Sequence, residues 1–215
     1  MKPFHPTFGQ RLWPDGLRVL QVYALPDLPE GSALHTLFAG LRESLADFPI
    51  VPVPDGRAHI TLDMITSAPA DAIGDADRRE LAHRLRTAVA GLGPLALQAG
   101  SPIAYRTGVR FDLHPDGQLA VLQQRVRSAI HRVCGDGSTG YPLGVLHMTA
   151  GYAAADVDTD ELAQVIHRVR PGHAPFTVRR IVLIEVYWQR VAVDDADAPG
   201  WRICWDTLAD IPLDG

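Results

Sequence analysis

The sequence predicts an α+β protein built from two lobes that pack side by side. Short segments rich in Val, Ile, Leu and Tyr alternate with segments whose apolar residues recur at helical spacing. The order of these elements in the first half of the chain returns in the second half. Because no long linker or low-complexity segment separates the halves, we expect residues 1–215 to form a single domain with interleaved lobes.

The first half is expected to contain two strands and two helices. Residues 17–26 (LRVLQVYALP) carry apolar side chains on both faces and stop at a proline, as central strands do. Residues 31–48 follow with one apolar stripe, and Ser32 is expected to cap that helix. A turn leads to a strand with the sequence AHITLDMI at 58–65, and a second helix is expected over about 75–90.

The second half repeats this order. Residues 94–113 are expected to form a strand pair or one long bent strand, followed by a helix over 119–133. A strand at 143–152 (LGVLHMTAGY) and a helix at 162–169 come next. The last two strands are expected over 177–189 and 200–213, joined by the polar, turn-prone residues 193–200. The stretch before residue 17 shows no strand pattern, so no strand is expected there.

Composition and charge limit the classes of partner. The chain has 20 Lys and Arg against 25 Asp and Glu, whereas proteins that grip long nucleic acids present basic surfaces. We therefore expect no long nucleic-acid surface, but a small pocket for one phosphate or one RNA end is compatible with this balance. No apolar run approaches the roughly 20 residues of a membrane span, and the first residues lack a signal-peptide core. The expectation is a cytoplasmic monomer without membrane contact.

Two short motifs carry the functional signal, HITL at 59–62 and HMTA at 147–150. Residues i and i+2 of a strand project to the same face, so His59 is expected beside Thr61 and His147 beside Thr149. The apolar residues between them turn towards the core. Each strand therefore offers one imidazole and one hydroxyl on a rigid mount.

These groups suit phosphodiester cleavage. A neutral imidazole takes a proton from an attacking water or hydroxyl, and a protonated imidazole gives one to the departing alkoxide. Histidine serves both steps because its ordinary pKa lies near 6.5. Threonine hydroxyls donate hydrogen bonds to non-bridging phosphate oxygens. No metal or other cofactor is expected.

A third His-x-Thr, HPT at 5–7, is set aside because Pro6 does not fit a central strand. With nine histidines, roughly half of one such motif is expected by chance. The other two motifs gain weight from their apolar strands and their matching places in the repeat.

With these two motifs the chain resembles the 2H phosphoesterase superfamily, the proteins related to 2'-5' RNA ligases and 2',3'-cyclic phosphodiesterases. HITL and HMTA fit the signature His-x-Thr/Ser followed by a usually hydrophobic residue, and VYALP at 22–26 is similar to the family's first strand. Ala150 is smaller than the usual last residue. The resemblance implies a bilobal fold with pseudo-two-fold symmetry, in which each lobe has an antiparallel sheet with helices on its outer face. The two motif strands would face each other across a central cleft.

The resemblance also implies a metal-independent phosphodiesterase. Its substrates would be nucleotides or RNA ends with a 2',3'-cyclic phosphate, or short 2'-5'-linked nucleotides. His59 and His147 would be the acid–base pair, and Thr61 and Thr149 would bind the phosphate oxygens. The sequence leaves open which histidine is the base.

Further residues are candidate substrate contacts. Asp63 follows the first motif on the same face and could orient its histidine, shape substrate choice or end the strand in solvent. Arg57 could neutralise a phosphate or lie on the surface. Tyr23 could stack on a base or belong to the core. Tyr105 and Arg110 come from the expected strand pair and could line one rim of the cleft.

Two other classes of function stay open. A metal-dependent hydrolase would use His59, Asp63 and His147 as ligands, although the sequence offers no further well-spaced ligand. A non-catalytic module of the same fold would bind nucleotides or a protein partner without turning them over.

Overall fold

A computed structural model describes residues 1–194 and 196–214, and it confirms the α+β class. Strand, helix, strand, helix and strand follow one another twice along the chain. The first unit consists of β3 (Val19–Pro26), α1 (Ala33–Ser44), β5 (Ile60–Met64), α2 (Asp75–Val89) and β6 (Leu95–Ala104). The second consists of β7 (Gly108–His114), α3 (Asp116–Cys134), β8 (His147–Ala153), α4 (Thr159–Ile166) and β9 (Ala174–Val191), and β10 (Gly200–Pro212) follows. The segment 94–113 is therefore a strand pair.

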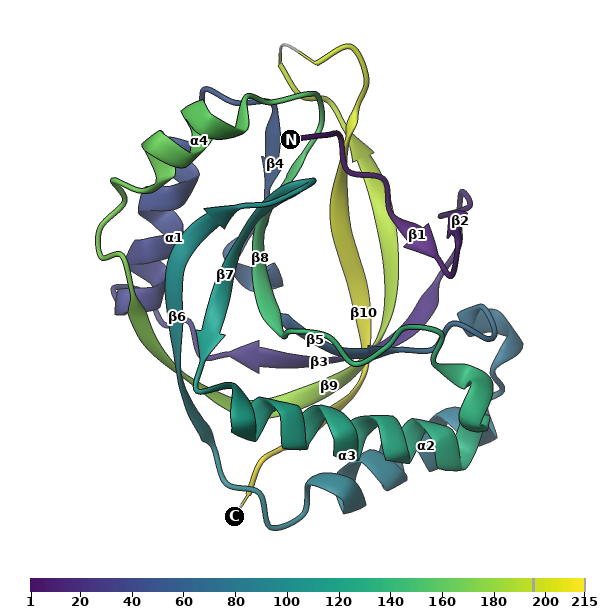
Figure 1. The fold of residues 1–215 in the computed structure, drawn as a ribbon. Coiled ribbons are helices and arrows are strands. Elements are labelled where there is room, and N and C mark those ends of the chain that lie inside the picture. Colours follow the sequence, from purple (N-terminus) through teal and green to yellow (C-terminus); the bar gives the residue numbers. More distant parts are fainter. Residues whose placement is uncertain (195, 215) are drawn as a thin grey trace.

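One curved sheet joins the two units, with the strand order β10-β9-β3-β5-β8-β7-β6 and with β4 (Ile50–Pro52) beside β8 (Figure 1). All of these described pairings are antiparallel. The long strand β9 pairs with β6 through its first residues and with β3 and β10 through the rest. Because one strand belongs to both halves, we infer that the lobes fold as one domain.

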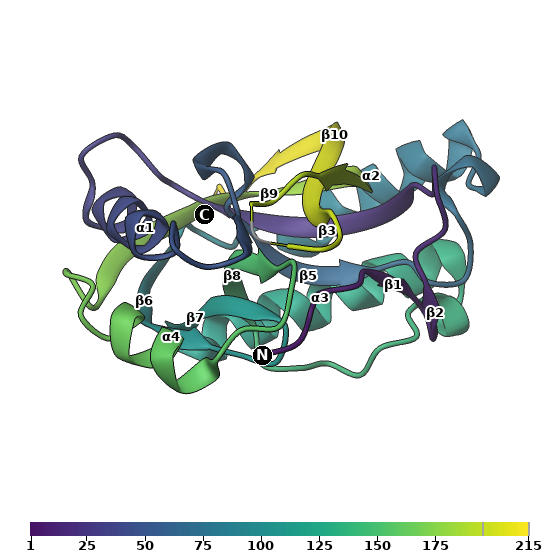
Figure 2. The same ribbon diagram turned by 90° about the horizontal axis from the view of Figure 1, so that it is seen from above.

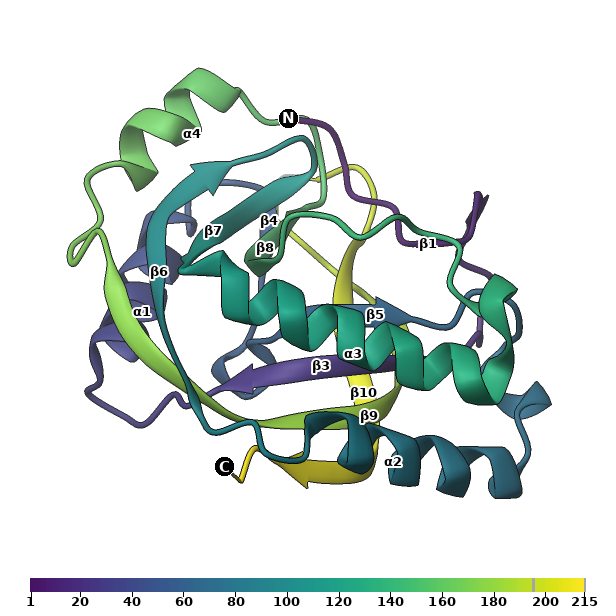
Figure 3. The same cartoon turned by 60° about the horizontal axis from the view of Figure 1, so that its bottom comes forward.

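Helices cover the outer side of the sheet. The helices α2 and α3 lie side by side along one half, and α1 and α4 lie together over the other (Figure 3). Each presents the apolar stripe seen in the sequence; in α1 the stripe buries Leu34, Leu37, Phe38 and Leu41. Ser32 caps α1 as expected, since its hydroxyl accepts a hydrogen bond from the backbone N–H of His35 at 3.2 Å. Among the described residues, no helix has the length and apolarity that a membrane crossing requires.

The N-terminal segment departs from expectation. Residues 1–13, which we call the N-terminal strap, contain two short strands, β1 (Thr7–Phe8) and β2 (Arg11–Leu12) (Figure 2). Two-residue strands are too short to show an alternating pattern, and the turn between them needs the positive φ of Gly9. Backbone N–H groups of Lys2 and Phe4 tie the strap to the carbonyls of Arg106 and Ala153. The expected turn at 193–200 includes residue 195, which lies outside the described residues.

Candidate active site

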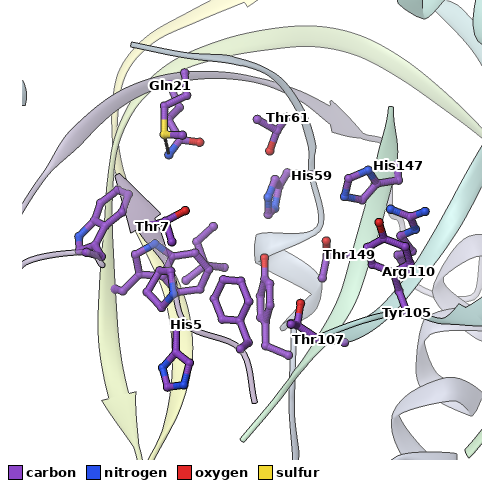
Figure 4. Close-up of a pocket in the computed structure, with 18 of the residues that line it drawn as sticks. His5, Thr7, Gln21, His59, Thr61, Tyr105, Thr107, Arg110, His147 and Thr149 are labelled. Carbon is purple, nitrogen blue, oxygen red and sulfur yellow. Dashed lines mark hydrogen bonds between the residues drawn. The ribbon is translucent and has the colours of Figure 1, made fainter. Parts of the chain in front are cut away.

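The register of the sheet brings the two motifs together. Ile60 of β5 pairs with Met148 of β8 in antiparallel orientation, and both side chains are buried on the helix side. The residues on either side of this pair therefore project to the opposite face. Those residues are His59, Thr61, His147 and Thr149, and all four line one pocket (Figure 4).

The expectation that the motif strands face each other across a cleft is wrong in this detail. They are neighbours in one sheet, joined by the single Ile60–Met148 pair. The halves share a continuous sheet, and its concave side forms the pocket. Aromatic side chains from the strap and from β8 and β9 complete the wall, including Phe4, Tyr152 and Trp188.

His59 sits at the base of the pocket with 4% of its surface exposed. Its ring stacks on Tyr23 at 4.1 Å between centroids and meets the edge of Trp205 at 5.4 Å. Its Nδ1 lies 2.7 Å from the carbonyl oxygen of Arg57. A carbonyl oxygen can only accept, so Nδ1 carries the hydrogen and Nε2 of the neutral ring keeps a free lone pair.

Burial lowers the pKa of His59 from 6.5 to about 4. The backbone hydrogen bond to Arg57 opposes this effect, and the nearby charge of His147 adds to the decrease. The ring is therefore neutral near pH 7. A neutral, oriented imidazole that opens on a pocket has the form required of a general base.

His147 repeats this arrangement in a more open position. Its Nδ1 lies 3.1 Å from the carbonyl oxygen of Val145, which is also two residues earlier in the chain. Burial lowers the pKa of His147, and the positive charge of Arg110 lowers it further, while Asp112 raises it. The backbone contact again leaves Nε2 free. Both imidazoles thus expose the same ring nitrogen.

Two tyrosines border the hydroxyl groups of the motifs. Tyr23 is buried, and its hydroxyl donates to Oε1 of Gln21 at 2.8 Å. Burial raises the pKa of Tyr23 and of Tyr152 well above the usual value, while the neighbouring hydroxyls of Thr61 and Thr149, respectively, lower it in part. Both tyrosines therefore stay neutral and add no negative charge to the pocket.

The side chains that line the pocket carry more positive than negative charge. Among the described residues that line its cavity of about 480 Å³, Arg110 is the one Lys or Arg, and none is Asp or Glu. The guanidinium of Arg110 stacks on the ring of Tyr105 at 3.6 Å from its centroid. Two of the expected substrate contacts, Tyr23 and Tyr105, thus lie at the pocket, and Arg110 lies there as well.

Asp63 does not share the face of the motif residues, contrary to expectation. Val22 of β3 pairs with Asp63 and Tyr23 pairs with Thr61, so Leu62 is an extra residue in β5. This β-bulge reverses the alternation, and Asp63 becomes buried away from the pocket. Its carboxylate accepts hydrogen bonds from Nε and Nη2 of Arg127 at 2.7 and 3.0 Å.

Arg57 is likewise not a pocket residue. It lies in the short helical turn η1 (Asp55–Arg57), and its guanidinium stacks on Trp205 at 4.4 Å from the ring centroid. Its Nη1 donates to the backbone oxygen of Trp205 at 3.2 Å. Arg57 contributes to the site through its carbonyl, which orients His59.

Sequence reasoning missed the contribution of the strap. His5 and Thr7, from the motif that was set aside, line the pocket (Figure 4). Trp13 lines it as well. Their placement depends on how the strap crosses the sheet, which no local pattern reveals. Gln21 was also missed, although a lone polar residue inside an apolar strand could have drawn attention to it.

The donor set proposed for a metal is not assembled. The bulge separates Asp63 from His59 and His147, and its carboxylate is taken up by Arg127. In the part of the chain that the structure describes, no three His, Cys, Asp or Glu side chains are grouped as metal ligands.

Comparisons with solved structures identify the same fold. TT0787 of Thermus thermophilus shares 15% sequence identity at a TM-score of 0.60, covering 92% of this chain and 98% of that chain. LigT of E. coli complexed with 3'-AMP shares 15% identity at a TM-score of 0.61, covering 93% and 99%. LigT complexed with NADP+ shares 16% sequence identity at a TM-score of 0.59, again covering 93% of this chain and 99% of that chain. No curated protein matches this chain.

The family model described as the 2'-5' RNA ligase superfamily matches residues 29–187. This range holds both His-x-Thr motifs and most of the chain. The chain therefore belongs to the 2'-5' RNA ligase superfamily, among the 2H phosphoesterases.

Proposed function

We propose that the protein is a metal-independent phosphodiesterase with a two-histidine mechanism. Its substrates would be nucleotides or RNA ends with a 2',3'-cyclic phosphate, or short 2'-5'-linked nucleotides. The observation that carries this proposal is the Ile60–Met148 pair. Because of this pairing, two imidazoles and two hydroxyls project from the same face of the sheet and line one pocket.

The two histidines divide the proton transfers according to their burial. His59, whose pKa is about 4, is the neutral base that takes a proton from water as the water oxygen attacks phosphorus. His147 lies in a more open position and holds the proton once the phosphate anion is bound. As the bond from phosphorus to the ribose oxygen breaks, Nε2 of His147 gives its proton to that oxygen. The products are a phosphomonoester and a free hydroxyl.

The threonines bind the charge that develops on the phosphate. Their hydroxyls lie on the same face as the imidazoles and can donate to the two non-bridging oxygens. Attack of water adds negative charge to these oxygens, so the hydrogen bonds strengthen in the transition state. Such donors accelerate the reaction without a metal.

The size and lining of the pocket support a small substrate. A cavity of about 480 Å³ with aromatic walls and one arginine suits one phosphate with an attached flat group. The structures of LigT with 3'-AMP, ATP and NADP+ show nucleotides in a protein of this fold and support a nucleotide ligand here. We further propose that the protein acts as a cytoplasmic monomer.

The test is turnover of 2',3'-cyclic nucleotides, 2'-5' dinucleotides and ADP-ribose cyclic phosphate by purified protein. His59→Ala and His147→Ala should each lower kcat by about 10²–10⁴-fold while thermal unfolding is retained. His83→Ala, an exposed position on α2, is the matched control and should retain full activity. Activity should persist in a strong chelator. Full activity of either pocket variant would refute the mechanism.

A further inference from the structure

The pocket holds a guanidinium with unused hydrogen-bonding capacity. The Nε of Arg110 is excluded from solvent and has no hydrogen-bond partner among the described residues. An unpaired donor of a charged group is costly in a folded protein unless a ligand satisfies it. No hydrogen bond among the described residues uses another guanidinium nitrogen of Arg110 either, and the residue lines the pocket, so its guanidinium has N–H donors left for an acceptor that binds there.

Seven other arginines of the described chain, unlike Arg110, have their charges neutralised by carboxylates. Ion pairs to Asp or Glu are formed by Arg18, Arg42, Arg78, Arg84, Arg127, Arg179 and Arg180. None of the ion pairs in the described residues involves Arg110. Its positive charge is thus directed at the pocket without a protein counter-ion.

The fold holds this guanidinium at the catalytic strand. Arg110 of β7 pairs with Thr149 of β8, and its charge acts on His147. Tyr105, in the loop that joins β6 to β7, supports the flat face of the guanidinium, which lies 3.6 Å from its ring centroid (Figure 4). Stacking fixes the plane of the group and leaves its edge, which carries the N–H donors, for an anion.

We propose that Arg110 binds a non-bridging phosphate oxygen on the His147 side of the pocket, with Tyr105 as its positioning residue. This inference rests on the proposed function and extends it beyond the two motifs. Negative charge on the phosphate oxygens increases when water attacks, so Arg110 stabilises the transition state more than the bound substrate. Its removal should therefore lower kcat more than it raises KM.

A purely structural role for Arg110 makes a different prediction, and the chain offers a matched control. Arg190 stacks on Trp201 at the same 3.6 Å, and it does not line the pocket. If stacking alone mattered, Arg110→Met and Arg190→Met would have similar consequences. If anion binding matters, only Arg110→Met will affect the reaction.

The experiment measures binding of inorganic phosphate by calorimetry and turnover of a 2',3'-cyclic nucleotide. Arg110→Met should weaken phosphate binding at least about tenfold and lower kcat about 10²-fold. Arg110→Lys, which keeps the charge, should recover part of both losses. Tyr105→Leu should give an intermediate loss, and Arg190→Met should give none.

The outcomes separate this inference from the function on which it rests. The role of Arg110 would be overturned if folded Arg110→Met or Arg110→Lys bound phosphate as tightly as the unaltered protein. It would also be overturned if the unaltered protein bound no phosphate. If the histidine variants were then inactive, the two-histidine mechanism would still stand. Conversely, the protein could bind phosphate through Arg110 and yet cleave none of the test substrates. That result would support the anion site and refute the proposed phosphodiesterase.

Discussion

Replacing His59 with glutamine should remove part of the pH dependence of folding stability between pH 4 and 6.5. In the native protein, burial lowers the pKa of His59 from 6.5 to about 4, whereas the unfolded chain restores the ordinary value. Below pH 6.5 the unfolded state therefore binds a proton that the native state does not bind. Stability then rises with pH, and the contribution of this ring is lost as the pH falls from 6.5 towards 4.

The size of the effect follows from the same pKa. The difference between 6.5 and about 4 corresponds to about 3 kcal/mol, at roughly 1.4 kcal/mol for each pKa unit. This is a large part of the roughly 5–15 kcal/mol that is typical of folded domains. Burial of His147 acts in the same direction, but that residue is present in both proteins, so it cancels in the comparison.

The assay is urea unfolding of the unaltered protein and of His59→Gln at several values between pH 4 and 7.5. As the pH falls to 4, the free energy of unfolding of the unaltered protein should decrease by about 3 kcal/mol more than that of His59→Gln. Any constant difference that glutamine causes does not change this comparison. His83→Gln, at an exposed position, should keep the pH dependence of the unaltered protein. Parallel pH profiles for the unaltered protein and His59→Gln would refute the argument that burial keeps His59 neutral.

Two substitutions outside the catalytic groups test the placement of neighbouring elements. Asp63→Asn should destabilise the protein by about 3 kcal/mol in urea unfolding, because it leaves the partly buried charge of Arg127 without its partner, yet kcat should change less than about threefold. A loss of kcat comparable to that of the histidine variants would show that Asp63 acts in the pocket after all. Gly108→Ala should lower the melting temperature, since a Cβ there would lie 2.2 Å from the backbone oxygen of Gly151 and force β7 away from β8 at a cost of about 1–3 kcal/mol or more. Gly117→Ala, where a Cβ meets open space, should be tolerated, and equal melting temperatures for the two alanine variants would contradict the close approach of these strands.

The sequence predicted those features that depend on local periodicity. Helical stripes and the alternation of strands gave the order of elements, and the i, i+2 rule placed each histidine beside its threonine. The pairing of Ile60 with Met148 was beyond reach because register depends on how the entire sheet closes. The bulge at Leu62 shows the limit most clearly, since one extra residue turned Asp63 from an expected pocket residue into a buried partner of Arg127. The strap was missed for the same reason, as its position depends on distant backbone partners.

Similar motifs in different surroundings can have different proton affinities. Both histidines sit one residue from the Ile60–Met148 pair, and both direct Nδ1 to a carbonyl two residues earlier. Their surroundings differ, because His59 lies beneath Tyr23 and against Trp205. His147 lies in a more open place between the opposing charges of Arg110 and Asp112.

This inequality assigns the acid and base roles, because two equal imidazoles would share one proton between two arrangements. Burial withholds the proton from His59, while the phosphate anion draws it to the more accessible His147. A variant that opens the cover over His59, such as Trp205→Ala, should raise its pKa towards 6.5 and move the acid limb of the kcat/KM profile to higher pH. If NMR titration of the ring found the pKa of His59 unchanged in that variant, then burial by the aromatic side chain would not be what separates the base from the acid.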